Sequence, residues 1–301
     1  GMHTGHAFVR GNREVKPEGQ APMPANIVTL PRLLKKAGYT KSPTPILFCE
    51  AESIFGAPFF LMEFVEGAII RNKVPQGMLL GKQEFEKLSR SAVDCLVELH
   101  QLELVQSGLI QLGKPEGFTQ RQVTGWVERY FRAKTKEIPE LENAAIWLQE
   151  NIPSTEYTAF IHNDFKYDNL VLDPADPCSI RSVLDWEMAT IGNPLMDLGT
   201  TLAYWAEESD PEILKLFNLS HLPGNLTREE LMDYYFTKAA GSKEEMIFYY
   251  VFGLVKVAVI AQQIFKRYSL GHSNDARFAQ LIYVVEAAGK KAIQTLQTNQ
   301  F

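Results

Sequence analysis

This sequence has few cysteines and no long run of charge of one sign. Its three cysteines, Cys49, Cys95 and Cys178, are widely spaced and form no C-x-x-C pair, which argues against a disulfide framework and against a zinc–thiolate site. The formal net charge is -6, and an acidic surface repels phosphate backbones and anionic lipids. We therefore expect no nucleic-acid partner, no membrane partner and a cytoplasmic location.

Long apolar runs are also scarce, and only the stretch 246–265 has the length of a membrane span. Lys256 interrupts it near the middle, where a charge costs about 3 kcal/mol on insertion scales. The stretch is therefore predicted to be a buried helix of a helical domain. The start of the chain lacks a basic segment followed by an apolar one, so we expect no signal peptide.

Two different patterns divide the chain. Residues 1–45 show little periodicity apart from a short helix predicted at 30–37, with Gly38 as its C-cap. Residues 46–50 and 58–65 are apolar and aromatic, typical of two strands, and their short connection favours an antiparallel pair.

From Gln83 onward the spacing of apolar residues is mostly helical. Helices are predicted at 83–99, 126–133, 141–149, 195–206, 211–218, 228–239, 244–268 and 274–297. Short apolar runs between polar turns predict small strands at 160–161, 170–172 and 180–184. The fold class expected is α+β, with a small β-rich front and a large helical back.

The segment 160–187 carries the residues with the most informative chemistry. His162-x-Asp164 is followed five residues later by Asn169, which opens an apolar run, and Asp185 closes the next apolar run. Phosphoryl transfer needs a carboxylate near the acceptor hydroxyl and oxygen ligands for Mg²⁺. The spacing suits a hairpin that presents Asp164, Asn169 and Asp185 around one pocket.

Each of these residues also has an ordinary structural explanation. His162 suits a hydrogen-bonded core position, Asp168 a turn and Asp185 a helix cap. The combination in one segment, with Asp-Trp-Glu downstream of an apolar run, favours function.

Three stretches extend the pattern: 56–67, 183–187 and 192–198. With the segment above, they resemble the aminoglycoside phosphotransferase-like family, and in particular the amino-terminal kinase domains of acyl-CoA dehydrogenase family members ten and eleven. The resemblance implies a bilobal protein-kinase-like fold. Residues 1–66 would form a shortened β-rich N-lobe that ends in the hinge, and 67–301 a mainly helical C-lobe. It also implies ATP as phosphoryl donor and Mg²⁺ as cofactor.

The resemblance assigns roles to residues of the C-lobe. Asp164 would be the catalytic base or the residue that orients the hydroxyl, and Asn169 and Asp185 would hold Mg²⁺. His162 would brace the catalytic loop, and Asp197 would anchor that loop from the following helix.

In the N-lobe the resemblance points to the stretch from Met62 to Val65 as the hinge between the lobes. The backbone carbonyl of Glu63 and the amide of Val65 would meet the adenine edge. An ordinary core strand at 59–65 is compatible with the same sequence.

The family's N-lobe also carries a phosphate-covering loop, a strand cation and a partner carboxylate. Few residues precede the first predicted strand here. The candidate residues, none in a strand-like context, are Arg13, Lys16 and Lys35 for the cation and Glu14 and Glu18 for the carboxylate. Either the lobe is reduced, or residues are missing near Gln20 and Ile27, where the sequence resembles joins.

The expected function is transfer of the γ-phosphoryl group of ATP to a hydroxyl of a small molecule, with a hydroxyacyl-CoA-like metabolite favoured by the resemblance. The alternative is a non-catalytic nucleotide-binding module, a pseudokinase. Acceptor residues are expected after Asp197, where Tyr204, Glu207, Glu208 and Asp210 are available; the acidic ones suit a cationic acceptor or a solvated face equally. Asn163 stands where the family commonly has glycine, and asparagine tolerates the left-handed backbone that such a loop needs.

Overall fold

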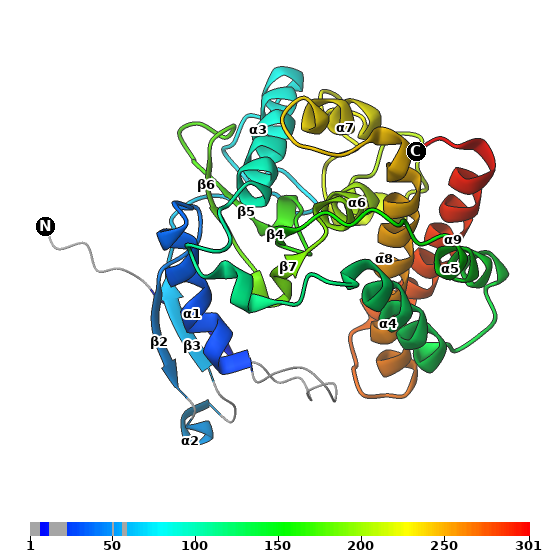
Figure 1. The fold of residues 1–301 in the computed structure, drawn as a ribbon, viewed down its shortest axis with the longest axis horizontal. Coiled ribbons are helices and arrows are strands. Elements are labelled where there is room, and N and C mark those ends of the chain that lie inside the picture. The colour runs from blue at the N-terminus through cyan, green and yellow to red at the C-terminus, as the bar shows by residue number, and fades with distance from the viewer. Residues whose placement is uncertain (1–6, 12–22, 50, 56–58) are drawn as a thin grey trace, which may run out of the picture.

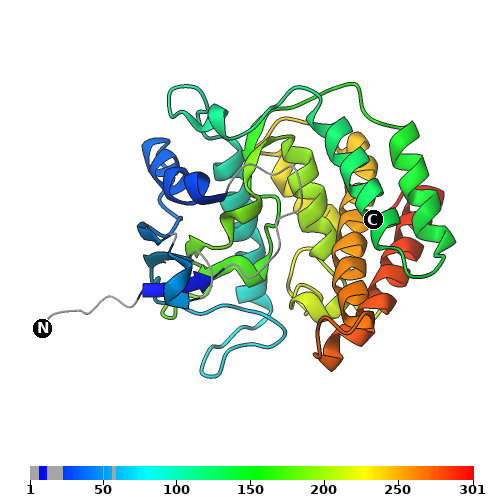
Figure 2. The same cartoon turned by 90° about the horizontal axis from the view of Figure 1, so that it is seen from below.

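The computed structural model describes residues 7–11, 23–49, 51–55 and 59–301. Figures 1 and 2 show the N-terminal strands and first helix on one side of the molecule and the C-terminal helices on the opposite side. The architecture is thus the α+β, two-lobed arrangement that the sequence predicts.

The N-lobe is built on an antiparallel sheet. In the described part of the lobe its strands are β1 (Ala7–Gly11), β2 (Pro45–Cys49) and β3 (Phe59–Glu63), in the order β1-β3-β2. The predicted pairing of the last two is confirmed. The connection between them also contains a short helix, α2 (Glu52–Phe55), which was not predicted.

Helix α1 (Met23–Lys36) joins β1 to β2, and its buried residues Leu30 and Leu34 belong to the main core. The prediction captured only its second half, because Pro31 inside the helix resembles a helix start. Gly38 follows the helix with φ +88°, a left-handed conformation that agrees with the predicted C-cap.

The C-lobe is a bundle of helices around α8 (Met246–Ser269), which contacts α4, α5, α6 and α9. The other long helices of this lobe are α3 (Lys82–His100), α4 (Phe118–Ala133), α5 (Pro139–Glu150), α6 (Pro194–Tyr204), α7 (Arg228–Phe236) and α9 (Leu281–Thr298). The helix predicted at 211–218 is only a 3₁₀ turn, Leu214–Phe217.

The apolar helix α8 lies inside the bundle. It is long and apolar enough to cross a membrane, yet 78% of its most apolar window is buried within the structure. A Cβ on Gly199 of α6 would lie 2.1 Å from the Tyr249 carbonyl oxygen, and one on Gly253 would lie 2.2 Å from the Gly199 carbonyl oxygen. The two helices therefore cross at a distance that only glycine permits, and the predicted core helix is confirmed.

Two small sheets place the chemical segment on the face of this bundle that adjoins the N-lobe. Strand β4 (Ala159–Ile161) pairs with β7 (Thr190–Gly192), and β5 (Leu170–Leu172) pairs with β6 (Ile180–Val183), both antiparallel. The three strands predicted in this region are confirmed, and β7 was not predicted. Both loops that carry the candidate residues therefore begin and end in paired strands.

Candidate active site

The loop between β4 and β5, residues 162–169, brings Asp164 and Asn169 together. Asn169 donates from Nδ2 to the Asp164 backbone oxygen at 2.9 Å and to its Oδ2 at 3.2 Å. Lys166 donates to both Asp164 carboxylate oxygens, at 3.0 and 2.9 Å. The Asp164 carboxylate is thereby fixed in orientation and still partly exposed, at 16% of its side chain.

Asp185 is the third predicted residue, and it directly follows Leu184, just after the end of β6. The backbone amide of Leu184 donates to the Asn169 carbonyl oxygen at 2.7 Å, which aligns the ends of β5 and β6. Asp185 follows with φ +66°, a left-handed conformation that is uncommon outside glycine. Asp185 also precedes a 3₁₀ turn, Trp186–Met188, and its side chain does not cap that turn.

A carboxylate and an amide oxygen are ligands that suit Mg²⁺, which keeps several waters and binds through one or two carboxylates plus substrate phosphates. Asn169 uses its Nδ2 on Asp164, so its Oδ1 is the atom that can serve as a ligand. The described residues contain no group of three His, Cys, Asp or Glu side chains placed to hold a metal. The residues present therefore fit a magnesium ion that is completed by phosphate and water, and not an all-protein metal cage.

Asp197 lies at the start of α6 and holds the beginning of the loop. Fully buried, it accepts the backbone amides of His162 at 2.7 Å and Asn163 at 2.8 Å, while His100 Nε2 lies 3.2 Å away. Burial by itself would raise the pKa of Asp197, but the hydrogen bond and charge of His100, with help from the charge of Lys256, keep that pKa below its ordinary value. Asp197 is thus an ionised anchor inside the lobe.

His162 connects the two loops. Its Nε2 lies 2.8 Å from the Leu184 carbonyl oxygen, and its Nδ1 accepts the Asp164 amide at 3.2 Å. An Nδ1 that accepts must be unprotonated, so Nε2 carries the proton in this arrangement. Burial lowers the pKa of His162, which agrees with a neutral ring.

The predicted hinge residues lie where β3 ends. The Glu63 amide donates at 2.8 Å to the carbonyl oxygen of Thr44, the residue before β2, and Val65 follows β3. The chain then joins the C-lobe at Ala68, whose amide and carbonyl both bond to Leu172 of β5, at 3.0 and 2.8 Å. The stretch that follows β3 therefore reaches β5 (Leu170–Leu172) at its last residue, Leu172.

Of the candidate cations and carboxylates of the N-lobe, Lys35 lies among the described residues and the others do not. Arg13, Glu14, Lys16 and Glu18 lie outside the described residues. Lys35 is an exposed residue in the last turn of α1, outside the sheet.

Lys256 is a site residue that sequence reasoning missed. It is 1% exposed and donates to both the backbone oxygen and Oδ1 of Asn163, at 2.6 Å each. Asn163 has φ +68°, so the expected left-handed conformation is confirmed, and its side chain gains a partner that glycine could not offer. Burial lowers the pKa of Lys256 to about 8. The signal in the sequence was a charged residue in the middle of an apolar helix.

The acidic residues considered for the acceptor have other partners. Asp210 is 5% exposed, bonds to Arg228 and lies 3.1 Å from Lys291, and Glu207 lies 3.5 Å from Arg228. A solvated face is therefore wrong for Asp210, which belongs to a buried ion cluster. Tyr204, by contrast, is beside the catalytic loop: its hydroxyl bonds to Asp164, and burial raises its pKa well above the ordinary value.

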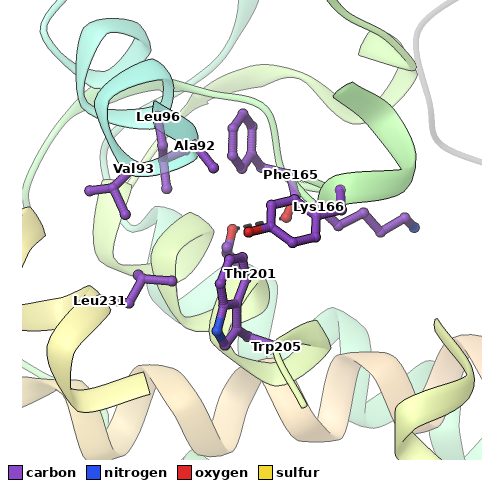
Figure 3. A pocket seen from close by; sticks show the side chains of 9 residues that line it. Ala92, Val93, Leu96, Phe165, Lys166, Thr201, Trp205 and Leu231 are labelled. Atoms are coloured by element: carbon purple, nitrogen blue, oxygen red, sulfur yellow. Dashed lines mark hydrogen bonds between the residues drawn. The ribbon is translucent and has the colours of Figure 1, made fainter. Parts of the chain in front are cut away.

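A small cavity lies behind the catalytic loop, between α3 and α6 (Figure 3). Its volume is about 10 Å³, and its walls include Ala92, Leu96, Phe165 and Trp205. Thr201 donates to the Phe165 backbone oxygen at 3.0 Å and closes one side. A space of this size holds at most a single water-sized molecule, so it is a packing gap and not a substrate site.

Known proteins share sequence similarity with most of this chain. Human acyl-CoA dehydrogenase family member 11 is 30% identical over 256 residues, which cover 84% of this chain and 32% of that protein. Mouse acyl-CoA dehydrogenase family member 10 is 31% identical over 254 residues, which cover 83% of this chain and 23% of that protein. The chain therefore spans a third or less of the length of these relatives.

Two solved structures show the same fold. A Ralstonia eutropha protein, provisionally described as an aminoglycoside phosphotransferase, matches with a TM-score of 0.75 at 24% identity, over 97% of this chain and 94% of that chain. Choline kinase from Cryptosporidium parvum matches with a TM-score of 0.60 at 13% identity, over 97% of this chain and 82% of that chain. A family profile described as "Phosphotransferase enzyme family" matches residues 14–231. Since this match covers more than half of the sequence and the predicted resemblance is confirmed, the chain belongs to the phosphotransferase enzyme family and has the bilobal kinase-like fold.

Proposed function

We propose that this protein transfers the γ-phosphoryl group of ATP, with Mg²⁺, to a hydroxyl group of a small molecule. The proposal is based on the arrangement of Asp164, Asn169 and Asp185. These residues lie on two adjacent loops that are held together by hydrogen bonds. Positioning and electrostatic stabilisation supply most of the catalysis in phosphoryl transfer, and both require such a fixed constellation.

Asp164 would accept the proton of the acceptor hydroxyl or orient that hydroxyl for attack. Its carboxylate is partly exposed, and Lys166 and Asn169 fix its plane. Asn169 Oδ1 and Asp185 would hold Mg²⁺, which when bound neutralises charge on the nucleotide phosphates. His162 and Asp197 would keep the loop in shape without touching substrate.

The nucleotide base would lie against the link between the lobes. We place the lobe boundary between residues 66 and 67, with Met62, Glu63 and Val65 along the adenine edge. Support comes from the position of this stretch, which leads from β3 directly to the Ala68–Leu172 contact next to the catalytic loop. Side-chain identity matters little for such a contact, because backbone groups would make it.

For the acceptor we propose a hydroxyacyl-CoA or a similar hydroxylated metabolite. The support is the likeness to acyl-CoA dehydrogenase family members 10 and 11, of which this chain spans only a part. The solved structures, at 24% identity or less, support the fold and not the acceptor.

The test is a screen of hydroxylated metabolites for ATP-dependent phosphorylation, with Asp164→Asn compared with the parent protein. Loss of the base should lower the rate about 10²- to 10⁴-fold while ATP still binds. Asp176→Asn, on the exposed β5–β6 turn, is the matched control and should keep the parental rate. An Asp164→Asn variant as fast as the parent would refute the role of Asp164, and Mg²⁺-dependent ATP binding without turnover of any metabolite would favour the pseudokinase.

A further inference from the structure

Helix α6 presents one face with three polar side chains to the catalytic loop. Asp197, Thr201 and Tyr204 are spaced by four and then three residues, so the helical repeat places them on the same face. Every residue of this helix is buried, and a buried polar group needs a hydrogen-bond partner. The partners of these three side chains all belong to the loop between β4 and β5.

Each of the three side chains bonds to a different part of that loop. Asp197 accepts two backbone amides at the start of the loop, at 2.7 and 2.8 Å. Thr201 donates to the Phe165 backbone oxygen at 3.0 Å (Figure 3). Tyr204 bonds through its hydroxyl to the Asp164 side chain. Two of these bonds therefore fix the backbone of the loop, and the bond from Tyr204 fixes the carboxylate.

Tyr204 contacts the carboxylate and also the cation that pairs with it. Its side chain is buried, and burial together with the negative charge of Asp164 raises the pKa of the hydroxyl, so the hydroxyl keeps its proton and donates it to the carboxylate. The Lys166 ammonium lies 4.4 Å from the centre of the Tyr204 ring and donates to both Asp164 oxygens. Ring and hydroxyl thus act on the same ion pair.

The position of Tyr204 is itself well defined. Asn218 donates from Nδ2 to the Tyr204 backbone oxygen at 2.9 Å, and the Phe217 ring meets the Tyr204 ring edge-on with their centres 5.8 Å apart. Gly199 of the same helix packs against α8 at a distance that only glycine permits. A helix fixed at these points has little freedom to shift, so the Tyr204 hydroxyl is a rigid reference for the loop.

We propose that Tyr204 is a positioning residue for phosphoryl transfer, whose hydroxyl holds the Asp164 carboxylate in the orientation that meets the acceptor hydroxyl. Placement matters, since a shift of about 1 Å in a catalytic group costs up to about 100-fold in rate. Tyr204 acts through Asp164, whereas the sequence suggested it as a contact of the acceptor. The proposal rests on the proposed function and adds the residue of α6 that sets the geometry of the base.

Tyr204→Phe tests the hydroxyl alone, because phenylalanine keeps the ring that Lys166 contacts. For an acceptor found in the metabolite screen, kcat should fall about 5- to 50-fold and the KM for ATP should stay at the parental value. Tyr250→Phe is the matched control: it removes the same atom from another buried tyrosine, whose hydroxyl has no hydrogen-bond partner among the described residues, and should keep the parental kcat. A parental kcat for Tyr204→Phe overturns the proposal.

A double-mutant cycle separates positioning of the base from general support of the fold. In the Asp164→Ala background no carboxylate remains to be oriented, so Tyr204→Phe should leave the residual rate within about twofold of that of Asp164→Ala alone. If Tyr204→Phe lowered the rate by the same factor in both backgrounds, its role would be structural and the proposal would be wrong.

The same set of proteins tests the contact without any acceptor. In urea, the effects of Tyr204→Phe and Asp164→Ala on the unfolding constant should be non-additive by at least about threefold. If no metabolite is phosphorylated in an Asp164-dependent manner, the phosphotransfer proposal fails, and this coupling still decides whether Tyr204 holds Asp164. If phosphorylation depends on Asp164 but not on the Tyr204 hydroxyl, or if the coupling is absent, the proposal for Tyr204 fails alone.

Discussion

Lys256 is a buried lysine whose charge should make the stability of the protein depend on pH. It lies in the middle of α8, its amine bonds twice to Asn163, and the charges that act on it come from Asp164, Asp197, Lys166 and Arg129. Burial is the largest effect and lowers its pKa from 10.5 to about 8. Between these two values the folded protein has lost a proton that the unfolded chain still binds, so stability should rise with pH in that window.

The magnitude follows from the size of the pKa change. One pH unit of difference corresponds to about 1.4 kcal/mol, so raising the pH from 8 to 10.5 should recover about 3 kcal/mol. Other groups act in the opposite direction: burial raises the pKa of Cys95 to about 11, and above pH 9 this costs stability. The lysine effect must therefore be measured as a difference between two proteins.

Lys256→Met supplies that difference, because methionine is unbranched, of similar length and uncharged. Urea unfolding of both proteins at several pH values from 7.5 to 9.5 would give the free energies. The parent should gain about 2 kcal/mol relative to the variant over this range. Lys290→Met, an exposed lysine on α9, is the control and should stay parallel to the parent. Parallel curves for Lys256→Met would refute the assignment of a low pKa to the buried lysine.

Three further predictions concern metal use, the buried ion cluster and helix packing. Asp185→Asn should raise the Mg²⁺ concentration for half-maximal activity at least about 10-fold, measured by magnesium titration; an unchanged requirement would contradict the assignment. Asp210→Asn removes the nearer of the two carboxylates beside Arg228, which is 1% exposed, and should lower the free energy of unfolding measured in urea by about 3–5 kcal/mol. Gly199→Ala puts a Cβ 2.1 Å from a backbone oxygen of α8 and should cost about 1–3 kcal/mol. Gly125→Ala, where a Cβ meets nothing within 4 Å, should instead stabilise α4 by up to about 1 kcal/mol, so the melting temperatures should move in opposite directions.

The candidate catalytic residues could be predicted from the sequence because they lie close together along the chain. Asp164 and Asn169 are five residues apart on one loop, and Asp185 ends the strand that pairs with the strand after Asn169. Most residues of these two strands are buried, and burial defines the register of a hairpin, so the apolar runs place the polar ends together. The strand 170–172 was accordingly predicted with the bounds that the structure shows.

Strands that form by pairing with segments far away in the sequence could not be predicted in this way. Strand β7 has the sequence Thr-Ile-Gly, which lacks the apolar run that marks β5, and it forms because β4 lies beside it. Strand β1 pairs with β3 from far along the chain, across a segment rich in glycine, proline and charge. Local propensity carries little information where pairing is non-local.

The charged pairings were the least predictable part of the site. Helical spacing shows which face of α8 is apolar, but it does not show that Lys256 meets Asn163 or that Arg129 shares an aromatic ring with it. The same limit explains why Asp210 was considered an acceptor residue. Its partner Arg228 belongs to another helix, and only the packing of the lobe brings the two together.

These contacts also bear on whether the protein is a catalyst or a pseudokinase. The loop carrying Asp164 is held by Asp197 of α6, by Lys256 of α8 and, through His162, by Leu184, all within the C-lobe. None of these bonds involves the described residues of the N-lobe, so within that part of the chain the support of the loop comes from the C-lobe. If the protein were inactive while the catalytic loop kept its structure, the defect would therefore have to lie in the part of the site that covers the nucleotide phosphates. A protein that binds an acceptor beside Asp164 but transfers no phosphate would have the defect on the nucleotide side, whereas a protein that binds no acceptor would have it in the C-lobe.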